Sequence, residues 1–505
     1  MPYTLPTALR YSEKAHEHVY KPRSHRLRFM ARRYLVLALT ALVLLVLLGR
    51  LFWHPEQWFA PQPFPDIDPT PLPPPPEIPA ALPPLYERYH QAELTLPQHG
   101  WQQPRPREHE KFLFVAGCGW GNAMQELVLN AYMAYKSNRS YANSARPVVG
   151  PSSSPSIFSF VFANYTWNDN GSPYSDYNGK KIPSLIPYSA LIRGPIVGGP
   201  YPPGDRAPLS VHRDYFDHVC PQKTTFIRED VSEIIHYKNS AKEIVDGWHD
   251  KLAAVAEPCV QTAPNSGQIF NFEVFGDPQA MLDIWPELAA SPILTHFGWS
   301  PLVELAFDTN RDLFFPADAP GTYLTDRPFT TNADRYGMIP GLMAIHVRRG
   351  DFEGHCAHLA TFSSQYNAFN SFTDMVTDAF VPPAPAPAGP AEAHQDERWE
   401  TYREHCYPSI EQIVRRVRAV RATRAARGLK KLYVMTNGDT HFVAELRAAL
   451  WRDQDWEGIA SSRDLVLGWE QKYVAQAVDM LIGQRAQILI GNGVGHVAAA
   501  CVAFG

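Results

Sequence analysis

The sequence predicts an α/β protein with two doubly wound domains that face each other across a cleft. Beyond residue 106, apolar runs of strand length alternate with segments of helical period, and a glycine-bearing turn follows a strand in each half. Strands that alternate with helices form parallel sheets, and ligands bind at the carboxyl ends of such strands. We expect one domain over residues 107–338 and a second, ligand-binding domain over residues 339–505.

The first domain begins with a strand, a glycine turn and a helix. Residues 111–116 are a short apolar run, residues 117–122 supply the turn, and residues 123–136 show helical periodicity. The segment 151–208 is rich in Ser, Pro, Gly, Tyr and Asn and is expected to be irregular. Two further helices are expected, over residues 231–255 and 278–307.

The second domain follows the same alternation. It opens with a buried-strand pattern over residues 342–347 and is interrupted by a proline- and alanine-rich insert over residues 381–393. The remaining elements, in chain order, are helix 409–427, strand 431–436, helix 440–450, helix 474–485 and strand 486–490. Glycine again follows the last strand, as Gly491-Asn492-Gly493.

Three segments of different composition precede the two domains. Residues 34–53 are the only long apolar run, and bulky residues rather than a cleavage site follow them, so we expect a retained transmembrane anchor. Residues 1–33 carry eight Lys or Arg against two Glu, which keeps this end in the cytoplasm. Residues 54–106 are rich in proline and predict an extended stem.

This order of segments predicts a single-pass type II protein of the endoplasmic reticulum or Golgi membrane, with both domains in the lumen. Three N-glycosylation sequons lie in the lumenal part, at Asn138, Asn164 and Asn170. Subtracting the tail's net charge of +6 from the whole-chain value of −5 leaves about −11 on the remainder. That sign argues against nucleic acid as a partner.

All six cysteines fall in the lumenal part, where disulfides are permitted, and no two have the spacing of a zinc or redox motif. We expect two bridges, Cys356–Cys406 and Cys220–Cys259, although the sequence leaves other pairings open. The remaining two, Cys118 and Cys501, are expected to be buried free thiols.

The sequence HVRRGDF at residues 346–352 directly follows a predicted strand. It resembles the HxRRxD motif of GDP-fucose fucosyltransferases, and the chain from about residue 111 onward is similar to the fungal-type protein O-fucosyltransferase-like group. Two further elements support the resemblance: GWGN at residues 119–122, and VMTN at 434–437 together with IGN at 490–492. The resemblance implies two Rossmann-like domains of the GT-B type and metal-independent, inverting transfer of fucose from GDP-fucose to a protein or glycan hydroxyl.

By this resemblance Arg348 is the catalytic residue, holding the β-phosphate and the oxygen that leaves the sugar. A permanently charged guanidinium suits this role because negative charge develops on the diphosphate in the transition state. His346 and Asp351 are expected beside it in the nucleotide pocket, with Gly121 and Asn122 at a helix start. The other residues expected at the nucleotide sugar are Gly119, Thr436, Asn437 and Asn492.

The chain departs from the family pattern at several of these positions. Asn437 stands where the family has an acid, and Gly495-His496-Val497 replaces hydroxyl residues that support the phosphates. Gly119 occupies the position of a basic residue, or of a glutamate base, in some relatives. Arg349 is expected to face away from Arg348 and to have a structural role. We assign no general base; the carboxylates that chemistry allows are Glu126, Asp334, Glu353 and Asp439.

Two Asp-x-Asp sequences, at residues 66–68 and 453–455, have the spelling of a metal signature but not its context. The first lies in the stem and the second follows a helix, so we expect no metal and no other cofactor. Two alternatives stay open: transfer of another GDP-sugar, and a non-catalytic lumenal binding protein that retains the fold.

Overall fold

The computed structural model describes residues 82–492 with several gaps. The gaps are 101–109, 116–119, 144–156, 169, 178, 232–239, 264–265, 267, 271, 276, 278, 320–322, 351, 366–367, 372–379 and 385–394. All described residues belong to one compact unit, Ala81–Gly505. The predicted tail and anchor, residues 1–53, lie outside the described residues. Among the helices that are described, none is long and apolar enough to cross a bilayer.

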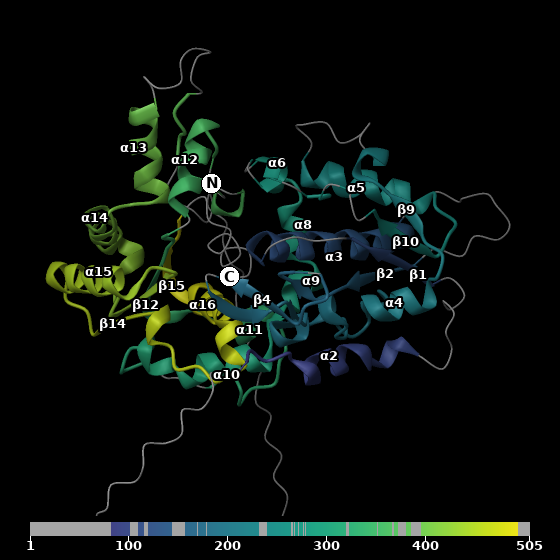
Figure 1. Ribbon diagram of the computed structural model, residues 1–505, viewed down its shortest axis with the longest axis horizontal. Coiled ribbons are helices and arrows are strands. Elements are labelled where there is room, and N and C mark those ends of the chain that lie inside the picture. The colour runs from purple at the N-terminus through teal and green to yellow at the C-terminus, as the bar shows by residue number, and fades with distance from the viewer. Residues whose placement is uncertain are drawn as a thin grey trace, which may run out of the picture. The chain divides into compact units, whose positions relative to one another are not determined.

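Five parallel strands form the first sheet, in the order β8-β2-β1-β10-β9 (Figure 1). The bounds are β1 (Glu110–Phe114), β2 (Ile157–Phe162), β8 (Val211–His212), β9 (Thr224–Phe226) and β10 (Cys259–Thr262), with helices α3 (Trp120–Asn143), α4 (Arg213–Val219) and α5 (Ala241–Ala253). Leu113 of β1 packs with α3 and α5, whereas Phe112 and Phe114 pack with α4. All three side chains are buried, as expected for a central parallel strand that helices cover on both faces.

Four parallel strands form the second sheet, in the order β14-β13-β12-β15. The bounds are β12 (Ile339–Val347), β13 (Lys431–Thr436), β14 (Gly458–Ser461) and β15 (Ala486–Ile490), with helices α14 (Ile410–Arg421), α15 (Thr440–Asp453) and α16 (Ala475–Gln484). Met343, Ile345 and Val347 of β12 pack with α14 and α15, which lie side by side in Figure 1. Tyr433 and Met435 pack on the opposite face, in the cluster that includes α16.

The protein is therefore an α/β protein with two parallel sheets, each covered by helices on both faces, as predicted. The strands of the first sheet end at Thr262 and those of the second begin at Ile339. The division into two domains at residue 338 stays a prediction.

Two expectations for the first half are wrong in part. The segment 151–208, expected to be irregular, contains β2, which lies next to β1 in the sheet. Residues 278–307 form several short elements rather than a long helix, because Pro286, Pro292 and Pro301 each stand in the first turn of a new helix. These elements are α7 (Gln279–Leu282), α8 (Trp285–Ala289), α9 (Pro292–Thr295), β11 (Gly298–Trp299) and α10 (Pro301–Thr309).

The predicted elements of the second half are found with small shifts. Strands 431–436 and 486–490 have the predicted bounds, whereas α14 ends at Arg421, short of the predicted residue 427. Strand β14 and two helices are additions that the sequence did not indicate. These helices are α12 (Phe352–Thr361) and α13 (Gln395–Cys406).

Part of the predicted stem is folded onto the compact unit. Helix α2 (Glu87–Leu94) lies within the predicted range 54–106, and the preceding Tyr86 is only 1% exposed. The hydroxyl of Tyr86 donates to the carbonyl of Glu470 at 2.6 Å, and Trp469 Nε1 donates to Leu82 O at 2.8 Å. The compact unit therefore includes part of the range predicted as stem, because buried side chains such as Tyr86 enter its core.

Two disulfides are present, and both confirm the expected pairings. Cys220–Cys259 joins the end of α4 to β10, with Cα atoms 5.8 Å apart. Cys356–Cys406 joins α12 to α13, with Cα atoms 5.9 Å apart. Cys118 and Cys501 lie outside the described residues.

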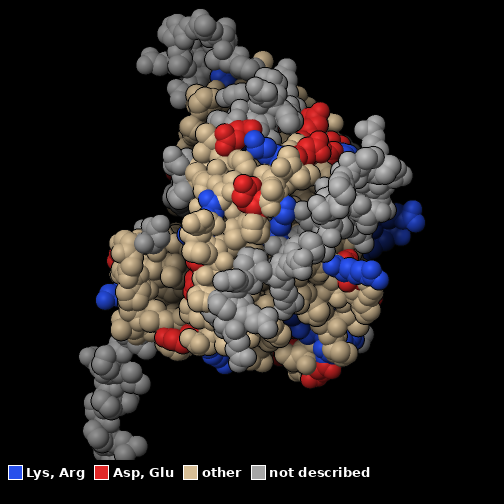
Figure 2. Space-filling model, turned by 90° about the vertical axis from the view of Figure 1, so that its right-hand side faces the viewer, with Lys and Arg blue, Asp and Glu red and all other residues tan. Residues whose placement is uncertain are grey.

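Figure 2 shows one face of the molecule, on which acidic and basic side chains are interspersed over the described part. On the described part of this face, the basic side chains do not form the continuous patch that is typical of a nucleic-acid-binding surface.

Candidate active site

A cavity of about 630 Å³ lies where β12 and β13 end. Its wall is formed by Arg349, Gly350, Glu353, Trp399, Arg403, Tyr407, Pro408, Ser409, Ile410, Asn437, Gly438, Asp439 and Phe442. These residues come from the segment after β12, from α13 and the connection to α14, and from the start of α15. The cavity thus occupies the carboxyl end of a parallel sheet, where ligands of α/β proteins bind.

Arg349 is fixed in the cavity wall by three contacts. Its guanidinium carbon lies 4.6 Å from the ring centroid of Tyr407 and 4.2 Å from that of Phe442, and Nη2 donates to Pro408 O. Burial lowers the pKa of Arg349, but an arginine stays protonated in proteins. These contacts support the expected structural role, and they also place a permanent positive charge in the wall of the cavity.

Asn437 joins the ends of β12 and β13. Its Oδ1 accepts from the backbone N–H of Arg349 at 2.7 Å, and its Nδ2 donates to the carbonyl of Arg349 at 3.0 Å. The guanidinium of Arg463 donates to the carbonyls of Asn437 and Gly438. Asn437 lines the cavity, but its amide is already engaged in holding the two strand ends together.

Thr436 is buried at the end of β13, where its hydroxyl donates to Val347 O at 2.6 Å and accepts from Gly438 N at 2.9 Å. Its backbone N–H donates to Ser462 Oγ, which in turn donates to the carboxylate of Asp479. The hydroxyl proton of Thr436 is therefore used within the protein, and the residue shapes the turn that carries Asn437.

The side chains of His346 and Arg348 lie on the opposite face of the sheet from that of Arg349. His346 is buried in β12 opposite Met435, and its Nδ1 has no hydrogen-bond partner among the described residues. Burial, helped by the positive charge of Arg348, lowers the pKa of His346 to about 4. His346 is therefore neutral near pH 7. Arg348 is half-buried, and its guanidinium lies 5.0 Å from the ring centroid of Phe352.

The two adjacent arginines thus have different surroundings. Arg349 packs on Phe442 of α15, on the side where Met343, Ile345 and Val347 pack, whereas Arg348 influences the buried His346. Alternation along β12 accounts for this difference. Neither His346 nor Arg348 lines the 630 Å³ cavity.

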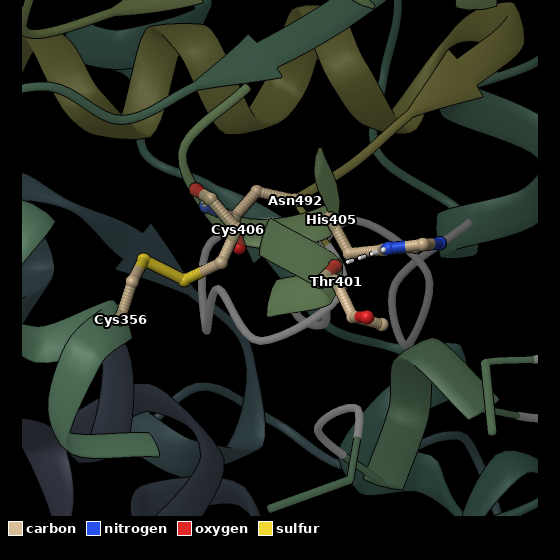
Figure 3. Close-up of a disulfide and its surroundings, with 5 residues drawn as sticks. All are labelled: Cys356, Thr401, His405, Cys406 and Asn492. Atoms are coloured by element: carbon tan, nitrogen blue, oxygen red, sulfur yellow. Dashed lines mark hydrogen bonds between the residues drawn. A yellow bond between two sulfur atoms is a disulfide. The ribbon is translucent and has the colours of Figure 1, made fainter. Parts of the chain in front are cut away.

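Asn492 lies just after β15, where it is buried and donates from Nδ2 to Cys406 O at 2.8 Å. Figure 3 shows this residue next to Cys406, whose disulfide to Cys356 extends away on the other side. His405 Nδ1 lies 3.0 Å from Thr401 O within the same helix. Asn492 and the disulfide together tie α13, which supplies part of the cavity wall, to the end of β15 and to α12.

Four of the predicted site residues cannot be placed by their side chains. Gly119 and Asp351 lie outside the described residues, as do residues 495–497. Gly121 and Asn122 are in the first turn of α3, after β1, which agrees with the predicted order of strand, turn and helix. The structure therefore brings Thr436, Asn437 and Asn492 to the ends of the second sheet, near the segment that carries Arg348.

Two of the four candidate carboxylates, Glu353 and Asp439, line the cavity. Asp439 also caps α15 by accepting from Phe442 N at 2.8 Å, whereas Glu126 is buried in α3. Thr331 caps α11 (Asn332–Arg335) by accepting from Asp334 N at 3.2 Å, and the Asp334 carboxylate accepts from the Thr331 hydroxyl at 2.6 Å. No sequence pattern pointed to Trp399 and Arg403 as residues of the cavity wall. The expected Cys356–Cys406 bridge beside the motif was the one signal that could have pointed to α13.

No family model matches the chain, and no curated protein matches it. Among solved structures, the chain is similar to POFUT1 in complex with GDP, with 13% identity and a TM-score of 0.39 over 78% of this chain and 93% of that chain. It is also similar to POFUT1 in complex with GDP-fucose, with 13% identity and a TM-score of 0.42 over 79% and 94% of the two chains. Both TM-scores are below 0.5.

Proposed function

We propose that the chain is a glycosyltransferase of the GT-B type that moves fucose from GDP-fucose to a hydroxyl group of a protein or glycan, with inversion and without a metal. The observation that carries the proposal is the position of HVRRGDF, which begins inside β12 and continues past its carboxyl end. In parallel α/β sheets this is where nucleotides bind. The proposed location is the lumen of the endoplasmic reticulum or Golgi, behind an anchor at residues 34–53.

The charges at the end of β12 suit a diphosphate leaving group. Burial keeps His346 neutral, so the positive charge next to it at the end of β12 comes from Arg348. Contacts with Tyr407, Phe442 and Pro408 hold the Arg349 side chain in place. These contacts also fix the backbone at the end of β12, where Arg348 is the preceding residue. A charged donor that is positioned before the reaction needs little reorganisation as the transition state forms.

In the proposed reaction the acceptor oxygen bonds to C1 of fucose while the bond from C1 to the β-phosphate oxygen breaks. The electron pair of the broken bond leaves with GDP, and the acceptor proton passes to solvent or to a carboxylate. Arg348 would donate hydrogen bonds to the oxygen that gains negative charge, and these bonds strengthen as the charge develops. Arginine supplies here the charge that a metal ion supplies in other transferases.

A second candidate function is nucleotide-sugar binding without turnover, and Asn437 favours it. The family acid at this position is replaced by an amide, and both ends of that amide are engaged by the backbone of Arg349. The cavity wall therefore lacks one charged group that would hold the nucleotide. Binding of a GDP-sugar with no transfer or hydrolysis would support this second function.

The experiment that tests the proposal is a nucleotide-sugar screen with the purified full-length protein. Binding is measured by calorimetry and hydrolysis by release of nucleotide, for GDP-fucose, GDP-mannose, UDP-glucose and UDP-N-acetylglucosamine. We expect GDP-fucose to bind most tightly and to be the sugar that is hydrolysed. Preference for a UDP-sugar would contradict the proposed family relationship.

A further inference from the structure

A second group of ligand-type side chains lies far along the chain from the proposed active site. His90 and Glu93 are three residues apart on α2, and His212 is the last residue of β8. Each offers one nitrogen or oxygen, and these three atoms all lie within 4.8 Å of one another. Glu93 and His212 are each 1% exposed, whereas the side chain of His90 is 35% exposed.

Two atoms of this group are buried without a partner. Glu93 Oε1 accepts from the backbone N–H of Ser189 at 2.7 Å, but Oε2 has no hydrogen bond among the described residues. His212 Nε2 is likewise without one, and it lies 3.6 Å from Glu93 Oε2. An unmet buried polar atom destabilises a fold. A cation between these two atoms would satisfy both at once.

The separation suits a tetrahedral transition metal. Zinc bonds of about 2.0–2.1 Å to imidazole nitrogen and carboxylate oxygen place two tetrahedral ligands roughly 3.3 Å apart. The observed 3.6 Å between Nε2 and Oε2 therefore needs only a small contraction. Two imidazoles and one carboxylate are ligands that zinc and its neighbours prefer, whereas calcium and magnesium prefer oxygen alone.

The surroundings offer an outer partner for His212. Its Nδ1 accepts from the backbone N–H of Asp214 at 3.2 Å, so in the metal-free protein the ring proton is on Nε2. The carboxylate of Asp214 lies 3.9 Å from the same Nδ1 and 4.0 Å from His90 Nε2. If a metal takes Nε2, the proton moves to Nδ1, which then no longer accepts from the Asp214 N–H. Nδ1 can instead donate to the Asp214 carboxylate, which is the usual arrangement around a metal-bound histidine.

We propose that His90, Glu93 and His212 form a binding site for one zinc-like divalent cation, with Asp214 orienting His212 and water completing the coordination. Such an ion fastens α2 to the edge strand of the first sheet. The site is structural rather than catalytic, so it is compatible with a metal-independent transfer reaction and does not depend on it. The competing explanation for the 3.6 Å approach of Glu93 Oε2 and His212 Nε2 is a direct hydrogen bond between the two side chains, with no metal.

The test uses the purified full-length protein, stripped with a chelator and then dialysed against dilute zinc sulfate. Bound zinc is measured by elemental mass spectrometry, affinity by calorimetry, and thermal stability with and without zinc. We expect about one zinc per chain and a higher melting temperature with zinc. His90→Ala and Glu93→Gln should remove the bound zinc and the shift in melting temperature. Asp214→Asn should weaken zinc binding about 10- to 100-fold.

Matched controls separate the site from general surface binding. His441→Ala changes a histidine whose side chain is 82% exposed, and Glu87→Gln changes an exposed glutamate on the same helix as Glu93. Both controls should bind zinc as wild type does. His90→Ala removes a partly exposed ring, and circular dichroism of the metal-free protein checks that it is folded. Failure of wild type to bind zinc, or wild-type binding by either His90→Ala or Glu93→Gln, would overturn the proposal.

Discussion

The side-chain amide of Asn437, at the end of β13, makes two hydrogen bonds with the backbone of Arg349, at the end of the neighbouring strand β12. Its Oδ1 accepts from the Arg349 N–H, and its Nδ2 donates to the Arg349 carbonyl. An aspartate at position 437 could accept from the N–H of Arg349 but would place a carboxylate oxygen against its carbonyl. We therefore expect Asn437→Asp to lower the free energy of unfolding by about 1 to 3 kcal/mol. Urea denaturation of the two proteins measures this difference.

The matched variant Asn437→Ala removes both hydrogen bonds without adding a charge. It should cost less than Asn437→Asp, because no like-sign oxygens are brought together. If Asn437→Asp were as stable as wild type and bound GDP-sugars more tightly, the amide would be a substitution in the ligand site and not a link between strand ends.

Glu304 is the centre of a buried ionic cluster. Its carboxylate accepts from Arg335 Nε at 2.5 Å, Arg335 Nη2 at 2.6 Å, Arg193 Nη2 at 2.8 Å and Tyr336 OH at 2.6 Å, and its side chain is 2% exposed. Glu304→Gln removes the negative charge and leaves two guanidinium groups without it. We expect a loss of about 3 to 5 kcal/mol in the free energy of unfolding.

The control for this change is Glu400→Gln, which breaks the exposed Glu400–Arg403 pair and should leave stability near that of wild type. Denaturation curves in urea distinguish the two variants. Equal midpoints for Glu304→Gln and Glu400→Gln would contradict the importance of the buried cluster.

Asp479 makes stability depend on pH. Its carboxylate accepts from Tyr433 OH and Ser462 Oγ, each at 2.7 Å, and burial raises its pKa to about 6. The folded state therefore holds this proton more tightly than the unfolded state. The contribution of Asp479 falls as pH rises from its ordinary pKa of 3.8 to about 6, and above that pH it costs about 3 kcal/mol.

Asp479→Asn removes the cost of ionising a buried group, while the hydroxyl groups of Tyr433 and Ser462 can still bond to the amide. We expect the variant to gain stability relative to wild type at pH 7 and to lose that advantage at pH 4. Urea unfolding at several pH values measures the difference. A constant difference between the two proteins across this range would contradict the assignment to Asp479.

The compact unit begins at Ala81 rather than near residue 107. A fragment that begins at Ala81 keeps Tyr86 and its bond to Glu470, whereas one that begins at Gln91 cuts through α2. Loss of a buried aromatic side chain typically costs about 3 to 5 kcal/mol. We expect the shorter fragment to unfold at lower urea concentration or to aggregate, and equal stability of the two fragments would contradict this.

The sequence predicted the second sheet better than the first. Strands β13 and β15 are short apolar runs between polar or glycine residues, a pattern that buried parallel strands show by themselves. Strand β2 has the same character, but the Ser, Pro and Asn residues around it dominate the composition of its neighbourhood. Its place beside β1 is set by pairing between segments distant in sequence, which local pattern does not report.

The sequence pointed to the end of β12 and not to the walls of the cavity beyond it. Arg348 and His346 were expected at a site because the motif follows a recognisable strand, but neither lines the cavity. Trp399 and Arg403 could not, because α13 is a strongly polar segment that reaches the cavity through a disulfide and through Asn492. Likewise, the sequence could not show that the side-chain amide of Asn437 would be hydrogen-bonded to the backbone of Arg349.

The most direct test of the proposed transferase is turnover of GDP-fucose by Arg348→Ala. Loss of an electrostatic donor to the leaving group should lower kcat about 100- to 1000-fold, and Arg348→Lys should recover little because it lacks the bidentate fork. Arg349→Ala is the matched control, and its lost contacts with Tyr407, Phe442 and Pro408 should reduce stability more than turnover. Near wild-type turnover by folded Arg348→Ala, or indistinguishable rate and stability for Arg348→Ala and Arg349→Ala, would contradict the mechanism.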